Sequence, residues 1–293
     1  MKKSLSILLL LVLAAPTFVS CGTSQKAPQK KELGLQFYSM RDTLFRSKGN
    51  YLPIMQQVAS WGYTTLEAAG YDNGKFYGST PEEFKANAEK AGLKLLSSHA
   101  GRGLSREELA AHDFTAAMEW WKTAIAAHKA AGMSYIVTAG IGVPETIADL
   151  QTYCDYFNEV GKMCAAEGIQ YGYHNHSHEF RRVEGKVMYD YMIEHTDPKY
   201  VLFEMDVYWA NMGGAAPVNY FKRYPGRFKL LHIKDECTLG ESGMVGFDAI
   251  FNHADEAGLE HLIVEVECDP YPSVKESADY LLNAPFVKAS YAK

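Results

Sequence analysis

The sequence has few cysteines, no strong excess of either charge and no apolar run of membrane-spanning length. Its apolar run at residues 5–15 is shorter than the roughly 20 residues that a transmembrane helix needs. Lys and Arg number 29 against 35 Asp and Glu, and the resulting net charge of −6 argues against a nucleic-acid-binding protein. With 47% apolar and 22% charged residues, the chain is not a disordered one either. These absences leave an ordinary globular protein of 293 residues.

The first 20 residues have the pattern of a secretory signal. Lys2 and Lys3 precede the apolar run at residues 5–15, and small residues follow it. Cys21 at the predicted cleavage point resembles a bacterial lipobox, which implies cleavage before Cys21 and acylation of its thiol. Residues 21–32 are polar and aperiodic, and we interpret them as a flexible tether. We therefore expect a lipid-anchored protein of the bacterial cell envelope, on the periplasmic side, with a net charge of −8 once Lys2 and Lys3 are removed.

The remaining cysteines show no spacing that indicates a disulfide framework. They are Cys154, Cys164, Cys237 and Cys268. Disulfides are permitted outside the cytoplasm, but we expect four free structural thiols here.

Eight short β-rich segments alternate with longer helical patterns. The predicted strands are residues 33–37, 64–67, 94–98, 135–138, 169–174, 201–206, 228–233 and 261–266. A strand, a turn and a returning helix take about 30 residues, which is close to the spacing of these segments. The alternation predicts an α/β domain with parallel strands.

Helix start and stop signals agree with this order. Ser-Thr-Pro-Glu-Glu at 79–83 forms a typical helix start, with a hydroxyl cap, a proline at the first position and acids in the first turn. Predicted helices end at Gly92, Gly132, Gly168 and Gly258, shortly before predicted strands.

Eight such units predict a single (β/α)8 TIM barrel over residues 33–293, because this fold takes about 250 residues. An open doubly wound sheet would usually have a glycine-rich phosphate loop after its first strand. The segment after Phe37 is Tyr38-Ser39-Met40-Arg41-Asp42 and contains no glycine.

Titratable side chains stand at six of the eight predicted strand ends. In a TIM barrel the active site lies at the carboxyl ends of the strands, where these groups would converge. They include Glu67, His99, His174, His176, His178, Glu179, Glu204, Asp206, His232, Lys234, Glu265 and Glu267. The set predicts one catalytic or metal centre.

Mixed His and carboxylate ligands suit Mn²⁺, Co²⁺, Zn²⁺, Ni²⁺ or Fe²⁺. Asp206, His232 and Glu265 supply three such ligands from the last three strands. We expect the fourth from the fifth predicted strand. There His174 and His176 are two residues apart, and Glu179 follows shortly after.

Four motifs resemble the sugar-phosphate isomerase/epimerase family of xylose isomerase-like TIM barrels. They are Tyr-His-Asn-His-x-x-Glu-Phe at 173–180, Glu-Met-Asp-x-Tyr-Trp at 204–209, Leu-His-Ile-Lys-Asp at 231–235 and Val-Glu-x-Glu-x-Asp-Pro at 264–270. The last two are also similar to inosose dehydratases. The resemblance spans roughly residues 33–282 and implies one divalent metal ion, often Mn²⁺, held by Glu, Asp, His and Glu.

The last three family ligands match Asp206, His232 and Glu265, and the first does not match. Many members have Glu at the end of the fifth strand, where this chain has His174. Either His174 takes the ligand position or Glu179 reaches in from the loop. The departure argues against simple aldose–ketose isomerisation, in which the strand-5 Glu commonly also acts as a base.

The other strand-end residues have assignable roles. Glu67, His99 and Trp209 are candidates for substrate binding, and Lys234 for stabilising a developing enolate. His174, His176 and Glu179 are the candidate bases, and we expect at least one to have a pKa closer to neutrality.

Together these residues predict a metal-dependent isomerase or epimerase that acts on a non-phosphorylated sugar or keto-sugar through an enediolate. One alternative is a dehydratase, lyase or hydratase that acts on a 3-keto-sugar or glycoside by β-elimination. Another is a non-catalytic carbohydrate-binding lipoprotein. The sequence indicates no oligomeric state and no nucleic-acid partner.

Overall fold

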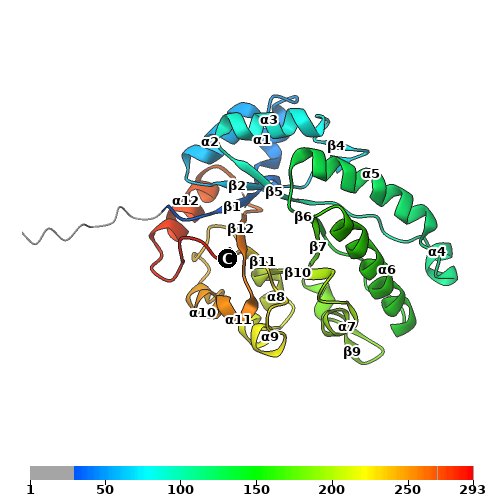
Figure 1. Cartoon of the computed structure of the whole chain (residues 1–293). Helices are drawn as coiled ribbons and strands as arrows, with labels where there is room; N and C mark the ends of the chain where they lie inside the picture. The colour runs from blue at the N-terminus through cyan, green and yellow to red at the C-terminus, as the bar shows by residue number, and fades with distance from the viewer. Residues whose placement is uncertain (1–29, 269, 293) are drawn as a thin grey trace, which may run out of the picture. The chain divides into compact units, whose positions relative to one another are not determined.

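Eight parallel strands close into a barrel in the computed structural model, which describes residues 30–268 and 270–292 (Figure 1). Around the barrel they run in the order β1, β12, β11, β10, β7, β6, β5, β2. They are β1 (Gly34–Gln36), β2 (Thr65–Ala68), β5 (Lys94–His99), β6 (Tyr135–Thr138), β7 (Gln170–His174), β10 (Val201–Asp206), β11 (Leu230–Lys234) and β12 (His261–Glu265). The structure confirms the predicted (β/α)8 class, and each predicted strand overlaps one of these eight.

Helices surround the barrel in Figure 1. They are α1 (Arg41–Arg46), α2 (Leu52–Ser60), α3 (Pro81–Ala91), α4 (Arg106–Ala111), α5 (Thr115–Ala131), α6 (Ile147–Ala166), α7 (Met188–His195), α8 (Val207–Met212), α9 (Pro217–Arg223), α10 (Phe247–Asn252), α11 (Ala254–Ala257) and α12 (Pro270–Asn283), with 3₁₀ turns η1 (Phe37–Met40) and η2 (His178–Phe180). Two small hairpins that the sequence did not predict follow strand ends. They are β3 (Tyr71–Asp72) with β4 (Lys75–Phe76), and β8 (Arg182–Val183) with β9 (Lys186–Val187).

The predicted helix signals are present as capping geometry. The Thr80 hydroxyl accepts from the Glu83 backbone N–H at 3.2 Å, and the Glu83 carboxylate accepts from the Thr80 N–H at 3.0 Å. This reciprocal pair satisfies two N–H groups that the first turn of α3 leaves open. At the helix ends, Gly92, Gly132, Gly168 and Gly258 all have φ between 73° and 80°, the left-handed region that glycine enters without steric cost.

The barrel interior is apolar at the amino ends of the strands. A separate buried cluster there consists of Leu96, Tyr135, Val137, Leu202, Leu230 and Ile263. Gly172 on β7 makes room for it, because a Cβ at this position would lie 2.7 Å from Leu202 Cδ1. This apolar layer fills the barrel at the amino ends of the strands, and the polar groups lie at the carboxyl ends.

Alternation along the strands brings the polar groups inside. On β10, Leu202 belongs to the interior cluster, so Glu204 and Asp206 face the interior as well. On β11, Leu230 and His232 follow the same pattern. The interior therefore changes from apolar to titratable toward the carboxyl ends of the strands.

Two of the expected free thiols form a disulfide instead. Cys237 and Cys268 are bonded, with their Cα atoms 5.4 Å apart. They follow β11 and β12, and these strands are neighbours in the barrel, which brings together residues 31 positions apart. The prediction for these two residues was wrong because spacing in the sequence carries no sign of that adjacency. Cys154 and Cys164 are buried free thiols, as predicted.

Among the described residues, no helix combines the length and hydropathy needed to cross a membrane. The predicted signal at residues 1–20 and the lipidated Cys21 lie outside the described residues.

Candidate metal centre and active site

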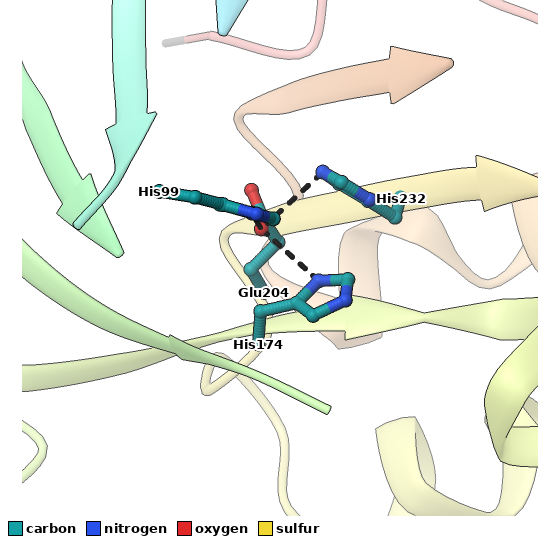
Figure 2. A group of neighbouring side chains, drawn as sticks. All are labelled: His99, His174, Glu204 and His232. Atoms are coloured by element: carbon teal, nitrogen blue, oxygen red, sulfur yellow. Dashed lines mark hydrogen bonds and ion pairs between the residues drawn. The ribbon is translucent and has the colours of Figure 1, made fainter. Parts of the chain in front are cut away.

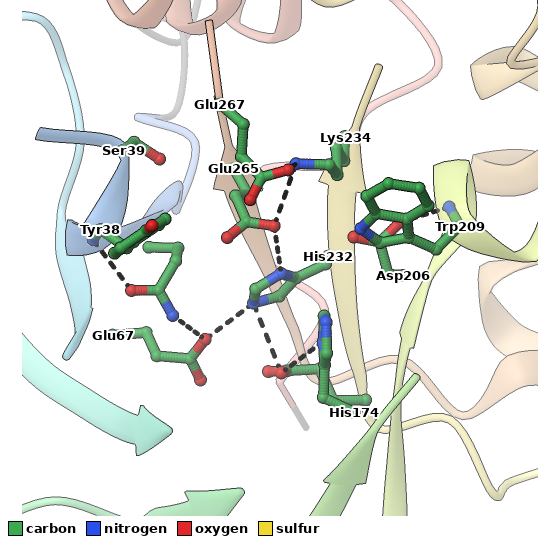
Figure 3. A network of polar contacts seen from close by, with 12 residues as sticks. Tyr38, Ser39, Glu67, His174, Asp206, Trp209, His232, Lys234, Glu265 and Glu267 are labelled. Atoms are coloured by element: carbon green, nitrogen blue, oxygen red, sulfur yellow. Dashed lines mark hydrogen bonds and ion pairs between the residues drawn. The ribbon is translucent and has the colours of Figure 1, made fainter. Parts of the chain in front are cut away.

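Asp206, His232 and Glu265 come together at the carboxyl ends of three adjacent strands (Figure 3). They end β10, lie within β11 and end β12. Strand register places Asp206 beside His232, and Glu265 beside Lys234 on β11. The three predicted ligands thus form one group, called the outer triad below.

Two atoms of the outer triad are buried without a hydrogen-bond partner. They are Asp206 Oδ2 and His232 Nδ1, and the latter lies 3.6 Å from Glu265 Oε2. An unpaired buried polar atom costs free energy, which a coordinated cation removes. One imidazole nitrogen and two carboxylates are donors that a divalent transition ion accepts. The residues present therefore fit the metal ion that the family resemblance implies.

The pKa values of the two carboxyl groups in the outer triad are shifted in opposite directions. Burial, together with the negative charge of Glu265, raises the pKa of Asp206 to about 7. Burial acts in the same direction on Glu265, but His232 and Lys234 outweigh it and lower the pKa of that carboxyl to about 2. Repulsion between the two carboxylates is what a cation between them would relieve.

Glu67 lies behind His232 and is fully buried. Its Oε1 is 2.7 Å from His232 Nε2, on the opposite side of the ring from the outer triad. It also accepts hydrogen bonds from Gln36 Nε2 at 2.9 Å and from Ser97 Oγ at 2.6 Å. Burial would raise the pKa of Glu67, but His99 and His232 hold it well below its usual range. A carboxylate in this place fixes the orientation of a metal-binding imidazole.

His174 is close to His232 but lies with a different set of partners. Its Nδ1 is 3.2 Å from Glu204 Oε2, which in turn is 2.8 Å from His99 Nε2 (Figure 2). His99, His174 and Glu204 are called the inner cluster below. Strand register sets Glu204 opposite His174, two residues deeper in the barrel than Asp206.

Glu179, the other candidate for the fourth ligand, is buried in η2. Its Oε1 accepts from the Tyr173 hydroxyl at 3.0 Å and its Oε2 from the His176 backbone N–H at 2.8 Å. It groups with His176 and His178 rather than with the outer triad. Burial raises the pKa of Glu179 toward neutrality, the direction expected for at least one candidate base.

His176 lies on the cavity wall beside His174, with ring centroids 5.0 Å apart. Burial and the nearby His178 lower its pKa to about 4, so the ring is neutral near pH 7.

Lys234 and Trp209 flank the outer triad (Figure 3). Lys234 Nζ contacts Glu265 Oε2 at 3.3 Å and Glu267 Oε2 at 2.5 Å. Burial would lower its pKa, but Glu265 and Asp206 raise it, so the ammonium stays charged. The Trp209 backbone N–H donates to Asp206 Oδ1 at 2.8 Å, and its ring lies 5.7 Å from Lys234 Nζ.

A cavity of about 500 Å³ opens beside these groups. Among the residues that line it are Tyr38, His99, Arg102, His174, His176 and Glu265. Of the predicted site residues, four line it, namely His99, His174, His176 and Glu265. Glu67 does not line it, and the predicted role of Glu67 in substrate binding stays a prediction.

Gln36 and Ser97 belong to the site but were not among the candidates from the sequence, and Glu204 was placed among the strand-end groups but was given no role of its own. The sequence indicates the direction of the Glu204 side chain, since Glu204 stands two residues before Asp206 on a strand and must face the same side. Nothing in the sequence beyond their positions on strands indicates that Gln36 and Ser97 belong to the site.

Comparison with known proteins agrees with this fold. The model of a family described as xylose isomerase-like TIM barrel matches residues 55–284. A sugar phosphate isomerase/epimerase from Parabacteroides distasonis ATCC 8503 is 38% identical, with 88% of this chain and 100% of that chain covered and a TM-score of 0.81. A second structure of this kind from the same organism is 37% identical over 91% and 98% of the two chains, with a TM-score of 0.81.

A more distant structure shares the fold alone. The 3-keto-D-glucoside 4-epimerase from E. coli is 17% identical over 86% of this chain and 98% of that chain, with a TM-score of 0.63. No curated protein sequence matches this chain.

Proposed function

We propose, given that the chain belongs to the xylose isomerase-like TIM barrel family, that it is a metal-dependent isomerase or epimerase acting on a non-phosphorylated sugar or keto-sugar. The observation that carries the proposal is the outer triad, whose buried and unpaired Asp206 Oδ2 and His232 Nδ1 lie next to the cavity that Glu265 lines. The ligand types suit Mn²⁺, Co²⁺, Zn²⁺, Ni²⁺ or Fe²⁺, and the family resemblance favours Mn²⁺.

Asp206, His232 and Glu265 would hold a divalent ion, which would polarise the carbonyl and the adjacent hydroxyl of a sugar and so acidify the C–H of the hydroxyl-bearing carbon. His176 is the base that the geometry favours, because its neutral ring lies on the cavity wall. Lys234 Nζ is fixed by Glu265 and Glu267, and its charge stabilises the enediolate oxygens that develop when the proton leaves. Delivery of a proton to the opposite face by an acid other than His176 gives epimerisation, and return of the proton to the neighbouring carbon gives isomerisation.

The charges around the cavity favour a neutral substrate over a sugar phosphate. Arg102 lines the cavity, but Glu108 already accepts from both of its terminal amino groups, at 3.0 and 2.7 Å. Lys234 is held between two carboxylates. A phosphate would have to displace these partners and would also face Glu265 and Glu267 on the wall.

We further propose that the protein works outside the cytoplasm as a lipoprotein, anchored through Cys21. The Cys237–Cys268 disulfide supports this location, because disulfides persist in oxidising compartments and are rare in the cytoplasm.

The test is incubation of the Mn²⁺-loaded protein with unphosphorylated sugars and 3-keto-glycosides in D₂O, followed by NMR. We expect one carbon-bound proton to exchange, with the label in an isomer or epimer of the substrate. Release of a β-substituent would instead identify the lyase alternative. A metal-loaded protein that exchanges no proton across the panel would contradict the proposal and favour a carbohydrate-binding protein.

A matched pair of variants separates the site from the fold. His176→Asn should lower the exchange rate at least tenfold. His261→Asn changes a histidine that begins β12, at the other end of the barrel, and should leave the rate unchanged.

A further inference from the structure

Three side chains that the outer triad does not include converge deeper in the barrel (Figure 2). Glu204 Oε2 lies 2.8 Å from His99 Nε2 and 3.2 Å from His174 Nδ1. The three come from β10, β5 and β7, so each is held by a barrel strand. Such separations are close to those between the ligands of one transition ion, whose bonds to nitrogen and oxygen are about 2.0–2.2 Å long.

Two atoms of the inner cluster are buried without a hydrogen-bond partner. They are His174 Nδ1 and Glu204 Oε1. His174 Nδ1 approaches the Glu204 carboxylate and yet makes no hydrogen bond with it. Buried polar atoms are rarely left in this state, and here the unpaired nitrogen points toward a carboxylate oxygen.

His232 lies between the two groups, and its Nε2 is 3.4 Å from Glu204 Oε2, so this imidazole borders the inner cluster as well as the outer triad. Its Nδ1 faces the outer triad, and its Nε2 is 2.7 Å from Glu67 Oε1. Apart from His232, the inner cluster has three ligands, two imidazoles and one carboxylate.

We propose that His99, His174 and Glu204 form a second metal site, which holds a divalent transition ion beside the one at the outer triad. Two histidines and one carboxylate are a ligand set for Fe²⁺, Zn²⁺ or Co²⁺, and three protein ligands leave coordination positions open. His99 and His174 line the cavity, so an open position would face it. The ligand that this position would take is water or a hydroxyl or carbonyl oxygen of a bound sugar. The count of two ions rests on the proposed function, because the first ion is the one at the outer triad.

The alternative to a metal ion at the inner cluster is a proton on His99. His99 Nε2 lies 2.8 Å from Glu204 Oε2 and 3.0 Å from Glu67 Oε1, so a protonated imidazole would also bridge the two carboxylates. The two occupants differ in the number of metal ions that a folded chain binds.

The experiment is metal counting on the full chain. The protein is stripped with a chelator, loaded with Co²⁺, freed of excess ion by gel filtration and analysed for cobalt per folded chain. We expect two ions in the wild-type protein, one in Glu204→Gln and one in Asp206→Asn. The visible absorption spectra of the two variants should differ, because each retains a different ion.

One ion in the wild-type protein, still present in Glu204→Gln, would overturn the second site and leave the proposed function intact. Failure of the proposed function has a different result, in which Asp206→Asn loses no ion. Glu260→Gln, at the amino end of β12, is the matched carboxylate control and should keep both ions.

Far-UV circular dichroism checks that each variant is folded. If Glu204→Gln does not fold, then His99→Gln replaces it, because the His99 side chain is 12% exposed and reaches the cavity. His99→Gln should also lose one ion, and retention of both would overturn the proposal.

Discussion

Replacing Glu67 with Gln removes the charge that orients His232 from behind. The 2.7 Å contact between Glu67 Oε1 and His232 Nε2 is charge-assisted, and hydrogen bonds to charged groups are worth about 1.5–3 kcal/mol. Loss of a carboxylate behind a metal-binding histidine typically weakens metal binding by about 10- to 100-fold. Each factor of ten is about 1.4 kcal/mol, so the two figures agree. We expect Glu67→Gln to weaken binding at the outer triad by this amount.

The assay is a competition titration in which a chelator of known affinity and the protein share Mn²⁺. Glu260→Gln is the control, because its carboxylate also accepts a short hydrogen bond, from Tyr135 at 2.6 Å, but at the amino end of β12. This variant should lower stability and leave the Mn²⁺ affinity unchanged. A Glu67→Gln protein whose Mn²⁺ affinity is within twofold of the wild-type value would refute the positioning role of Glu67.

The remaining predictions concern stability. Thr80→Ala removes the side-chain cap of α3 and should lower the free energy of unfolding by about 1 kcal/mol. Differential scanning calorimetry should then record a melting temperature lower by about 2–4 °C. Thr80→Ser keeps the hydroxyl and should show no such change. Reduction of the Cys237–Cys268 disulfide should lower the free energy of unfolding by about 2–4 kcal/mol, and urea curves that coincide with and without reductant would contradict this. His128 is buried in α5 and burial lowers its pKa to about 4, against about 6.5 in the unfolded chain, so the unfolded state binds more protons between these values. Stability should therefore be complete above pH 6.5 and fall by about 3 kcal/mol toward pH 4. His128→Leu should flatten that slope in urea titrations at several pH values, and an unchanged slope would show that other groups cause it.

The parts of the fold that depend on local pattern could be predicted from the sequence. Strand alternation, the hydroxyl-capped helix start at Thr80 and glycine helix ends such as Gly92 are set by residues close together in the chain, and the structure contains all of them. The outer triad could be predicted because a TIM barrel brings its strand ends together. His232 and Asp206 therefore meet through the fold class alone.

The parts that depend on side-chain packing between distant segments were missed. Glu67 and His232 are 165 residues apart, and the sequence does not show that one lies behind the other. The Cys237–Cys268 bond depends on the distance between two loops, which spacing does not reveal. Glu204 was placed among the strand-end groups, and its position two residues before Asp206 fixes the direction of its side chain, but its contacts with His99 and His174 could not be predicted from spacing.

The most direct test of the central claim is anomalous X-ray diffraction from crystals of the Mn²⁺-loaded protein, with data collected on both sides of the manganese absorption edge. The proposed function predicts an anomalous peak within about 2.0–2.3 Å of Asp206 Oδ2, His232 Nδ1 and a Glu265 oxygen. An outer triad without a peak in Mn²⁺-saturated crystals would contradict it.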